Sequence, residues 1–351
     1  MKSIVGLLVL FAAAVAGTVL GETEDVRRRA DFAAEIFTRI EAKPSIRGDD
    51  REWFFLVKEL RHLSSGRFWE KPWEEVAANQ SDPVPGVLEF QKLLAARGVR
   101  LLLVPVPAKA AIYPGKLVTG FKAGAAEPIA PFLERLREGG MELLDLEPVF
   151  IAAAVSSPET LLYCRQDAHF SPHAAELVAE LVAKGLDLPV GDGNGGVVVS
   201  APGSVAITGD QIAGSEWEGL VPQETLEVGR VTTLGGKPVE PDAESSVLLL
   251  GDSHTLVFQA GEENGMHCRS GGVFDHLAAK LGFAPDLVGV RGSGLVQARK
   301  QLFYKASAAP GYWAGKEVVI WLFSAREFTQ SSDRPVTIPL DKAPAVGGEE
   351  N

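Results

Sequence analysis

The sequence predicts an α/β protein, a three-layer α/β/α sandwich around a mostly parallel sheet, with a β-rich insertion. Two observations predict the layers: apolar runs typical of strands buried on both faces alternate along the chain with segments of helical periodicity. A third predicts the insertion, because residues 186–245 are rich in Gly, Val, Thr and Pro and show little helical period. The chain has 351 residues, 46% of them hydrophobic, and can bury a sizeable core.

The expected strands are short apolar runs that end in Gly, Pro or polar residues. The clearest reads VRLLLVPVP, and the five together are 99–107, a short strand within 141–150, 246–251, 286–290 and 317–323. The expected helices are 25–42, 87–98, 129–140, 274–282 and 295–307, with a further helix that begins at Ser171 and Pro172. Serine is a good N-cap, and proline suits the first helical position.

The two ends of the chain differ from the region between them. Lys2 precedes an apolar run at 4–21, and Ala14-Val15-Ala16 fits a small-residue cleavage site, as in a signal peptide. The run is also at the short end of what crosses a bilayer, so an uncleaved anchor is the alternative. We therefore assign residues 1–21 to a signal peptide or anchor, 22–335 to one domain and 336–351 to a disordered tail. Either reading of the N-terminus predicts a periplasmic or other extracytoplasmic protein.

Charge and cysteine content narrow the function classes. The net charge of -12 and the pI of about 5.1 argue against a general nucleic-acid binder, which needs a basic face. Cys164 and Cys268 are the only cysteines, and in an exported protein such a pair predicts one disulfide. Because each cysteine adjoins a candidate site segment, this bond would tie the two segments together. Two buried thiols are the alternative.

One candidate site segment is GDSH, directly after the expected strand 246–251. Gly251 permits a tight turn there, and Ser253 would project at the C-terminal edge of the sheet, where open α/β folds bind ligands. The Ser253 N–H would lie at a helix N-terminus, which suits an oxyanion. A serine hydroxyl becomes a good nucleophile only when a base accepts its proton.

The second segment supplies that base. Asp167 and His169 lie in a D-x-H pattern on the loop that enters the helix beginning at Pro172. His169 can accept the serine proton, and Asp167 can orient the imidazole and stabilise its charged form. A metal site that includes His173, one helical turn from His169, is the alternative. The helix start at Pro172 favours instead an exposed, first-turn position for His173.

Several motifs resemble a known family, the AlgX/AlgJ-like alginate O-acetyltransferases, whose domain is a permuted SGNH-hydrolase fold. VPVPAKAAIYP at 104–114 and VLLLGDSHT at 247–255 resemble its strand and serine blocks. DAHFSPHAA resembles its D-x-H-W-S-P block, with Phe170 in place of the usual Trp. WFFLVKELRHLSSGRFW, GVRGSGLVQARKQL and VVIWLFSAREF resemble further blocks, so the resemblance covers roughly 45–330. As in that family, Asp and His precede Ser along the chain.

The resemblance implies an O-acetyltransferase in which Ser253 accepts the acetyl group, His169 is the base and Asp167 is the orienting acid. It implies an exported polysaccharide as substrate, alginate-like or other, and a membrane-bound O-acyltransferase as acetyl donor. No metal or diffusible cofactor is needed. A secreted carbohydrate acetylesterase with the same three residues is the alternative. A non-catalytic polysaccharide-binding or assembly protein is another.

Other residues are candidates for the surroundings of the site. Arg291, Gly292 and Gly294 in GVRGSG could line the oxyanion hole or bind substrate, although a plain turn explains them equally well. His254 follows the candidate nucleophile and could touch the site, or could serve only the start of a helix. Lys109 could face the cleft, although a solvent-exposed strand-end lysine fits better. Arg326 could hold a carboxylate or a partner, and a surface ion pair explains it at least as well.

Overall fold

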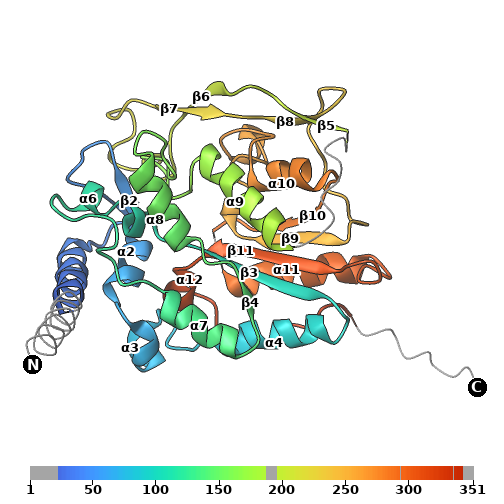
Figure 1. Cartoon of the computed structure of the whole chain (residues 1–351), viewed down its shortest axis with the longest axis horizontal. Helices are drawn as coiled ribbons and strands as arrows, with labels where there is room; N and C mark the ends of the chain where they lie inside the picture. Colours follow the sequence, from blue (N-terminus) through green and yellow to red (C-terminus); the bar gives the residue numbers. More distant parts are fainter. Residues whose placement is uncertain (1–22, 187–195, 293, 335, 343–351) are drawn as a thin grey trace, which may run out of the picture.

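A computed structural model describes residues 23–186, 196–292, 294–334 and 336–342 (Figure 1). The expected signal or anchor segment, 1–21, lies outside the described residues. At the centre is a five-stranded sheet in the order β10-β9-β11-β3-β4, and every pair in it is parallel. Its strands are β3 (Arg100–Val106), β4 (Glu142–Leu143), β9 (Val247–Gly251), β10 (Asp286–Gly289) and β11 (Val318–Ser324).

Strands β9 and β11 are almost entirely apolar because both faces of the sheet are covered. Every residue of β9 and β11 is buried. Successive side chains of a strand point to opposite faces, so Leu249 and Ile320 join one core cluster while Leu248 and Trp321 join the other. The predicted three-layer α/β/α sandwich with a parallel sheet is therefore confirmed.

Helices form the two outer layers. The first core cluster receives apolar side chains from α2 (Val57–Ser64), α8 (Glu147–Ser156), α9 (Pro172–Leu186) and α10 (Val273–Leu281). The second receives them from α4 (Val84–Ala95), α7 (Ala130–Glu138) and α11 (Leu295–Ala308). Figure 1 shows α9 and α10 above the sheet and α4 and α7 below it. No helix among the described residues is both long and apolar enough to cross a membrane.

The expected insertion forms two small antiparallel sheets. One pairs β5 (Val197–Val199) with β8 (Val231–Thr233), and the other pairs β6 (Gly203–Ile207) with β7 (Glu224–Val228). Strands β5 and β8 contact α10 and β7 contacts α9, so the insertion covers the outside of one helical layer (Figure 1). Near the N-terminus, β1 (Ser45–Arg47) pairs with β2 (Phe54–Leu56), which leads into α2.

Two expectations about local structure are wrong. The helix expected after Ser253 is a single 3₁₀ turn, η2 (Ser253–Thr255), followed by turns rather than α-helix. The β-branched Thr255 and Val257 lower helix propensity there. In the tail expected to be disordered, residues 336–342 are described: Leu340 belongs to the second core cluster, and its carbonyl accepts a hydrogen bond from Nε1 of Trp313 at 3.4 Å. Residues 343–351 lie outside the described ones.

The expected disulfide is also wrong, because Cys164 and Cys268 are free, buried thiols. Each lies against a different backbone carbonyl, with Sγ of Cys164 3.7 Å from the oxygen of Phe170 and Sγ of Cys268 3.9 Å from that of Phe258. Burial raises the pKa of both thiols, that of Cys268 to about 11.

We expect thiol titration of the unfolded, unreduced protein to find two free thiols per chain. In the folded protein the same reagent should react slowly, because neither sulfur is exposed and neither is a thiolate at neutral pH. A count of zero in the unfolded chain would show that the two cysteines are bonded to each other.

Candidate active site

Ser253 lies at the C-terminal end of a central strand. Strand β9 ends at Gly251, and Ser253 is the first residue of η2. A Cβ atom at position 251 would lie 2.2 Å from the carbonyl oxygen of Leu322 in β11 and 2.5 Å from Cγ2 of Thr255. Only glycine fits this close approach, which brings Ser253 to the edge of the sheet where α/β folds bind ligands.

Asp252 holds the turn in place. Its Oδ1 accepts hydrogen bonds from the backbone N–H of His254 at 2.9 Å and from Nδ1 of the same residue at 3.0 Å. Its Oδ2 accepts one from the N–H of Ser324, at the end of β11, at 2.8 Å. Burial opposes ionisation of Asp252, but contacts with His254 and the charge of Arg326 hold its pKa below the usual range. The turn that carries Ser253 is thus fixed to two strands.

The D-x-H loop precedes α9 and is held in place by a buried lysine, Lys109. Nζ of Lys109 donates hydrogen bonds to three carbonyl oxygens, those of Phe54 at 2.6 Å, Arg165 at 2.9 Å and Asp167 at 3.0 Å. Burial lowers the pKa of Lys109. The expectation of a solvent-exposed lysine is therefore wrong, because this ammonium group joins the loop to β2.

The structure brings the three candidate catalytic residues together. Nε2 of His169 lies 2.6 Å from Oγ of Ser253, and Nδ1 of the same ring lies 2.5 Å from Oδ1 of Asp167. Oδ1 also accepts a hydrogen bond from the backbone N–H of His169 at 2.9 Å. The three side chains form a continuous line of hydrogen bonds from carboxylate to imidazole to hydroxyl, which is the arrangement that activates a serine.

Burial and charge have opposite effects on the pKa values of Asp167 and His169. Burial disfavours the charged form of both groups, but each charge stabilises the other. The net result holds the pKa of Asp167 well below its usual range, with His169 and His267 as the opposing causes. For His169, burial lowers the pKa, but Asp167 and, to a lesser degree, Asp210 and Asp252 raise it to about 9.

The second oxygen of Asp167 has two partners that the sequence did not indicate. Oδ2 accepts hydrogen bonds from Nε2 of His267 at 2.7 Å and from the backbone N–H of Asp210 at 2.8 Å. A Cβ atom at Gly209 would lie 2.1 Å from the carbonyl oxygen of Gln166, so glycine is required where the insertion approaches the loop. The sequence offered one sign of His267, its position next to Cys268, and no motif surrounds it.

A cavity of about 350 Å³ is lined by these three candidate residues, Asp167, His169 and Ser253, called the triad below. Of the further candidates, His254, Arg291 and Gly292 line it, while Gly294 does not. Gly294 is instead the N-cap of α11, where a Cβ atom would lie 2.5 Å from Oδ2 of Asp333. The ring of His254 packs 4.8 Å from that of His169, and its Nε2 is buried without a hydrogen-bond partner among the described residues.

Arg326 also lines this cavity. Its Nη1 lies 3.1 Å from Oε1 of Glu59 and donates to Oγ of Ser324 at 2.8 Å. Both Arg326 and Glu59 are buried, so the expectation of a surface ion pair is wrong. The pair joins α2 to the end of β11, at the floor of the site.

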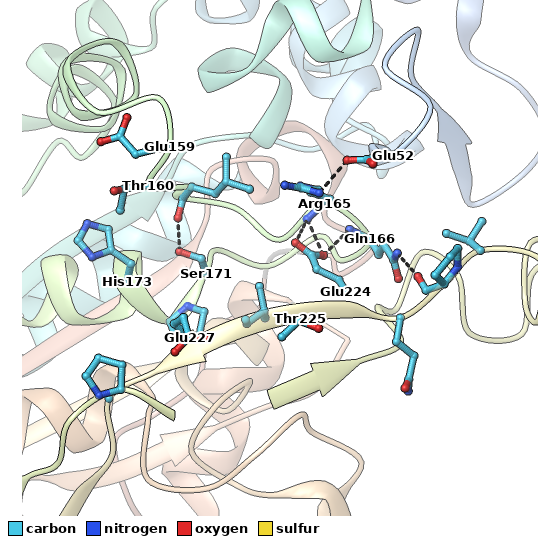
Figure 2. Close-up of a pocket in the computed structure, with 18 of the residues that line it drawn as sticks. Glu52, Glu159, Thr160, Arg165, Gln166, Ser171, His173, Glu224, Thr225 and Glu227 are labelled. Atoms are coloured by element: carbon cyan, nitrogen blue, oxygen red, sulfur yellow. Dashed lines mark hydrogen bonds and ion pairs between the residues drawn. The ribbon is translucent and has the colours of Figure 1, made fainter. Parts of the chain in front are cut away.

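A second, larger cavity of about 910 Å³ lies on the other side of the D-x-H loop (Figure 2). Figure 2 shows His173 facing this cavity, so His173 does not join His169 in the site and the metal alternative that needed it is wrong. The carboxylate of Glu224 accepts hydrogen bonds from the N–H groups of Arg165 and Gln166, which fixes the outer side of the loop.

Side chains of the kinds that bind metal ions, carboxylates and an imidazole, do lie close together at the triad. Among the described residues, Asp167, His169 and Asp210 form a group whose ligand atoms lie within 4.8 Å of one another. The imidazole Nδ1 and the Asp167 carboxylate are already hydrogen-bonded to each other, and Nε2 is directed at Ser253. This is the pattern of a serine triad rather than of ligands converging on a metal ion.

Comparison with known proteins agrees with this geometry. The family described as "SGNH hydrolase-like domain, acetyltransferase AlgX" matches residues 47–260, more than half of the chain and a range that contains all three triad residues. The chain belongs to this family. The AlgX/AlgJ-like resemblance inferred from the motifs is thereby confirmed, and an acetyltransferase family agrees with a serine that has a base beside it.

Relatives of the AlgX family show how far the likeness extends. The probable alginate O-acetylase AlgJ of Pseudomonas aeruginosa is 29% identical over 147 residues, 40% of this chain and 32% of that protein, so the chain spans about a third of its length. The O-acetyltransferase domain of Pseudomonas putida AlgJ superposes with a TM-score of 0.59 at 19% identity, over 82% of this chain and 93% of that one. Pseudomonas aeruginosa AlgX does so with a TM-score of 0.58 at 16% identity, over 84% and 66%. These likenesses show the SGNH-like fold.

Proposed function

We propose that this protein is an extracytoplasmic O-acetyltransferase that moves an acetyl group, through an acyl-enzyme on Ser253, to hydroxyl groups of a polysaccharide. The observation that carries the proposal is the line of hydrogen bonds from Asp167 through His169 to Ser253 at the mouth of a cavity. Membership in an acetyltransferase family supports acetyl as the group transferred.

The reaction follows from the geometry in two halves. In the first, Nε2 of His169 accepts the Ser253 proton while Oγ attacks the acetyl carbonyl, and the proton then passes to the departing donor group. In the second, a sugar hydroxyl gives its proton to His169 and attacks the acetyl carbon, after which Ser253 regains a proton. Asp167 stabilises the imidazolium in both halves. Ser253 and Gly292 line the cavity, and their backbone N–H groups are the proposed oxyanion donors.

The charge around the cavity supports an acidic polysaccharide as acceptor. The chain carries a net charge of -12, yet three cations, Lys58, Arg291 and Arg326, line this one cavity. Two carboxylates, those of Asp167 and Asp210, line it as well. Lys58 and Arg291 are exposed and can meet the carboxylates of a uronate polymer, with Nη2 of Arg291 held by the carbonyl oxygen of Gly265 at 2.9 Å. Arg326 is instead paired with Glu59. The printed name of the AlgJ relative, an alginate O-acetylase, points to the same class of substrate.

We expect Lys58→Ala to raise the KM for a polyuronate acceptor about fivefold, since one exposed ion pair contributes about 1 kcal/mol. The KM for a neutral oligosaccharide should rise less, and the difference should shrink at high salt because salt screens exposed charges. The matched control is Lys237→Ala, which removes an exposed lysine of the β-rich insertion. Equal effects on charged and neutral acceptors would contradict the proposed role of Lys58.

The acetyl donor proposed for this reaction is a membrane-bound O-acyltransferase, with the protein itself outside the cytoplasm, as the family resemblance and the apolar N-terminal run support. Separation of cell compartments, followed by detection of the protein, tests the location. Recovery of the full-length protein in the cytoplasm would contradict it.

The test of the function uses the purified protein, an acetyl-ester donor that releases a chromophore, and a uronate oligosaccharide. Release that accelerates with oligosaccharide, together with acetylated sugar detected by mass spectrometry, is the expected result. Fast release without acetylated sugar would indicate an acetylesterase that uses water as acceptor. Neither release nor acetylated sugar would indicate a non-catalytic polysaccharide-binding or assembly protein.

A further inference from the structure

We infer that His267 is a positioning residue of the catalytic unit, which holds the Asp167 carboxylate so that one oxygen alone faces His169. The inference deepens the proposed function and rests on it. His267 belongs to none of the motifs that mark the site. The chain brings it there from the segment that follows η3 (Glu262–Asn264).

The contacts divide the two oxygens of Asp167 between two imidazoles. Oδ1 accepts from Nδ1 of His169 at 2.5 Å, and Oδ2 accepts from Nε2 of His267 at 2.7 Å. The backbone N–H of Asp210 also donates to Oδ2, at 2.8 Å. The carboxylate is 1% exposed, so these protein donors take the place of water. With both oxygens occupied, the carboxylate cannot rotate away from His169 without breaking a hydrogen bond to a charged group.

The His267 ring is itself held in place. Its backbone N–H donates to the carbonyl oxygen of Val257 at 3.1 Å, and its ring lies 5.7 Å from that of Phe258. Both of these residues lie a short way after Ser253 on the chain. His267 therefore connects the segment that carries the serine to the loop that carries Asp167, and it lines the same cavity as the triad.

The hydrogen bond from His267 to Asp167 also bears on the pKa of His169. The other charged or titratable side chains that face His169 and Asp167 are Asp210, Asp252, His254 and Arg326, while Nζ of Lys109 meets the backbone carbonyl of Asp167. A donor on Oδ2 draws negative charge away from Oδ1. Loss of that donor leaves Oδ1 a stronger partner for the His169 imidazolium, so the pKa of His169 should rise further.

The experiment compares His267→Met, which fills the space without a donor, with His267→Gln, whose side-chain amide can donate. His173→Gln, on the exposed first turn of α9, is the matched control. Two readouts are taken for each variant: the NMR titration of the His169 imidazole, and the pH dependence of kcat with the acetyl-ester donor. The titration needs no substrate, so it tests the contact even if the protein transfers no acetyl group.

For His267→Met we expect the His169 titration and the acidic limb of the kcat profile to move upward by about one pH unit, with kcat down about tenfold and KM little changed. His267→Gln should recover most of both, and His173→Gln should match the unaltered protein. An unmoved His169 titration in folded His267→Met would overturn the inference. So would equal impairment of the Met and Gln variants, since shape rather than donation would then matter.

Discussion

Ser253→Ala and His169→Ala should each reduce acetyl transfer by about a million-fold, to background, and the double variant should be little worse than either. The serine is a nucleophile only because His169 accepts its proton, and without the serine His169 has no proton to transfer in the acyl step. The two groups therefore act as one unit across the 2.6 Å hydrogen bond that joins them. Asp167→Asn should lose less, since it keeps the shape but favours the wrong imidazole tautomer.

The pH dependence provides a second test of the same unit. Free His169 must be neutral to accept a proton, and its pKa is raised to about 9. Activity should therefore increase with pH through neutrality and reach half of its maximum near pH 9, rather than near pH 6–7 as for an ordinary histidine. Turnover of an acetyl-ester donor measures both effects, with circular dichroism as the folding control. Near-normal turnover by folded Ser253→Ala would show that Ser253 is not the nucleophile.

Lys109→Met should be the most damaging change outside the triad. It removes the ammonium group that donates to three buried carbonyl oxygens, of which that of Arg165 keeps a second donor, the N–H of Phe54 at 2.9 Å. We expect the free energy of unfolding to fall by about 3–5 kcal/mol and Tm by about 10 °C. One of those oxygens belongs to Asp167, so the loop should shift and acetyl transfer should fall about a hundredfold even where the protein is folded.

The chain offers a matched control for that variant. Lys116 also places its Nζ near the ring of Trp53, at 5.6 Å against 5.3 Å for Lys109, but its side chain is 42% exposed and pairs with Asp50 at the surface. Lys116→Met should therefore change the free energy of unfolding by about 0–1 kcal/mol. Thermal and denaturant unfolding measure both. Equal losses in the two variants would show that burial of the Lys109 ammonium is not what matters.

Residues whose partners lie in the same local pattern could be predicted from the sequence. The apolar runs indicated all five central strands, because a strand buried on both faces has to be apolar along its length. The order of the strands was not needed to join Ser253 to His169. In parallel sheets the carboxyl ends share one edge, so a turn after one strand and a loop before a helix can meet there.

Residues that belong to no recognisable motif, and whose role depends on a distant partner, could not be predicted. Lys109 reads as an exposed strand-end lysine until β2 and the D-x-H loop both lie against it. His267 reads as an isolated histidine until the turn after Ser253 directs it at Asp167. The disulfide failed for the same reason, since two cysteines near one site still depend on where each side chain points, and these face different carbonyls.

The place of β11 has a consequence for the order in which the molecule can assemble. It is the last of the five strands along the chain, yet it lies in the middle of the sheet, between β9 and β3. As the chain leaves the ribosome, β3 and β9 have no shared neighbour until β11 emerges, and the Asp252 carboxylate lacks the Ser324 N–H that fixes it. The nucleophile turn is therefore completed only after nearly all of the described chain has been synthesised. Until then the edges of β3 and β9 that pair with β11 remain uncovered, so a chaperone that shields them would act in this interval.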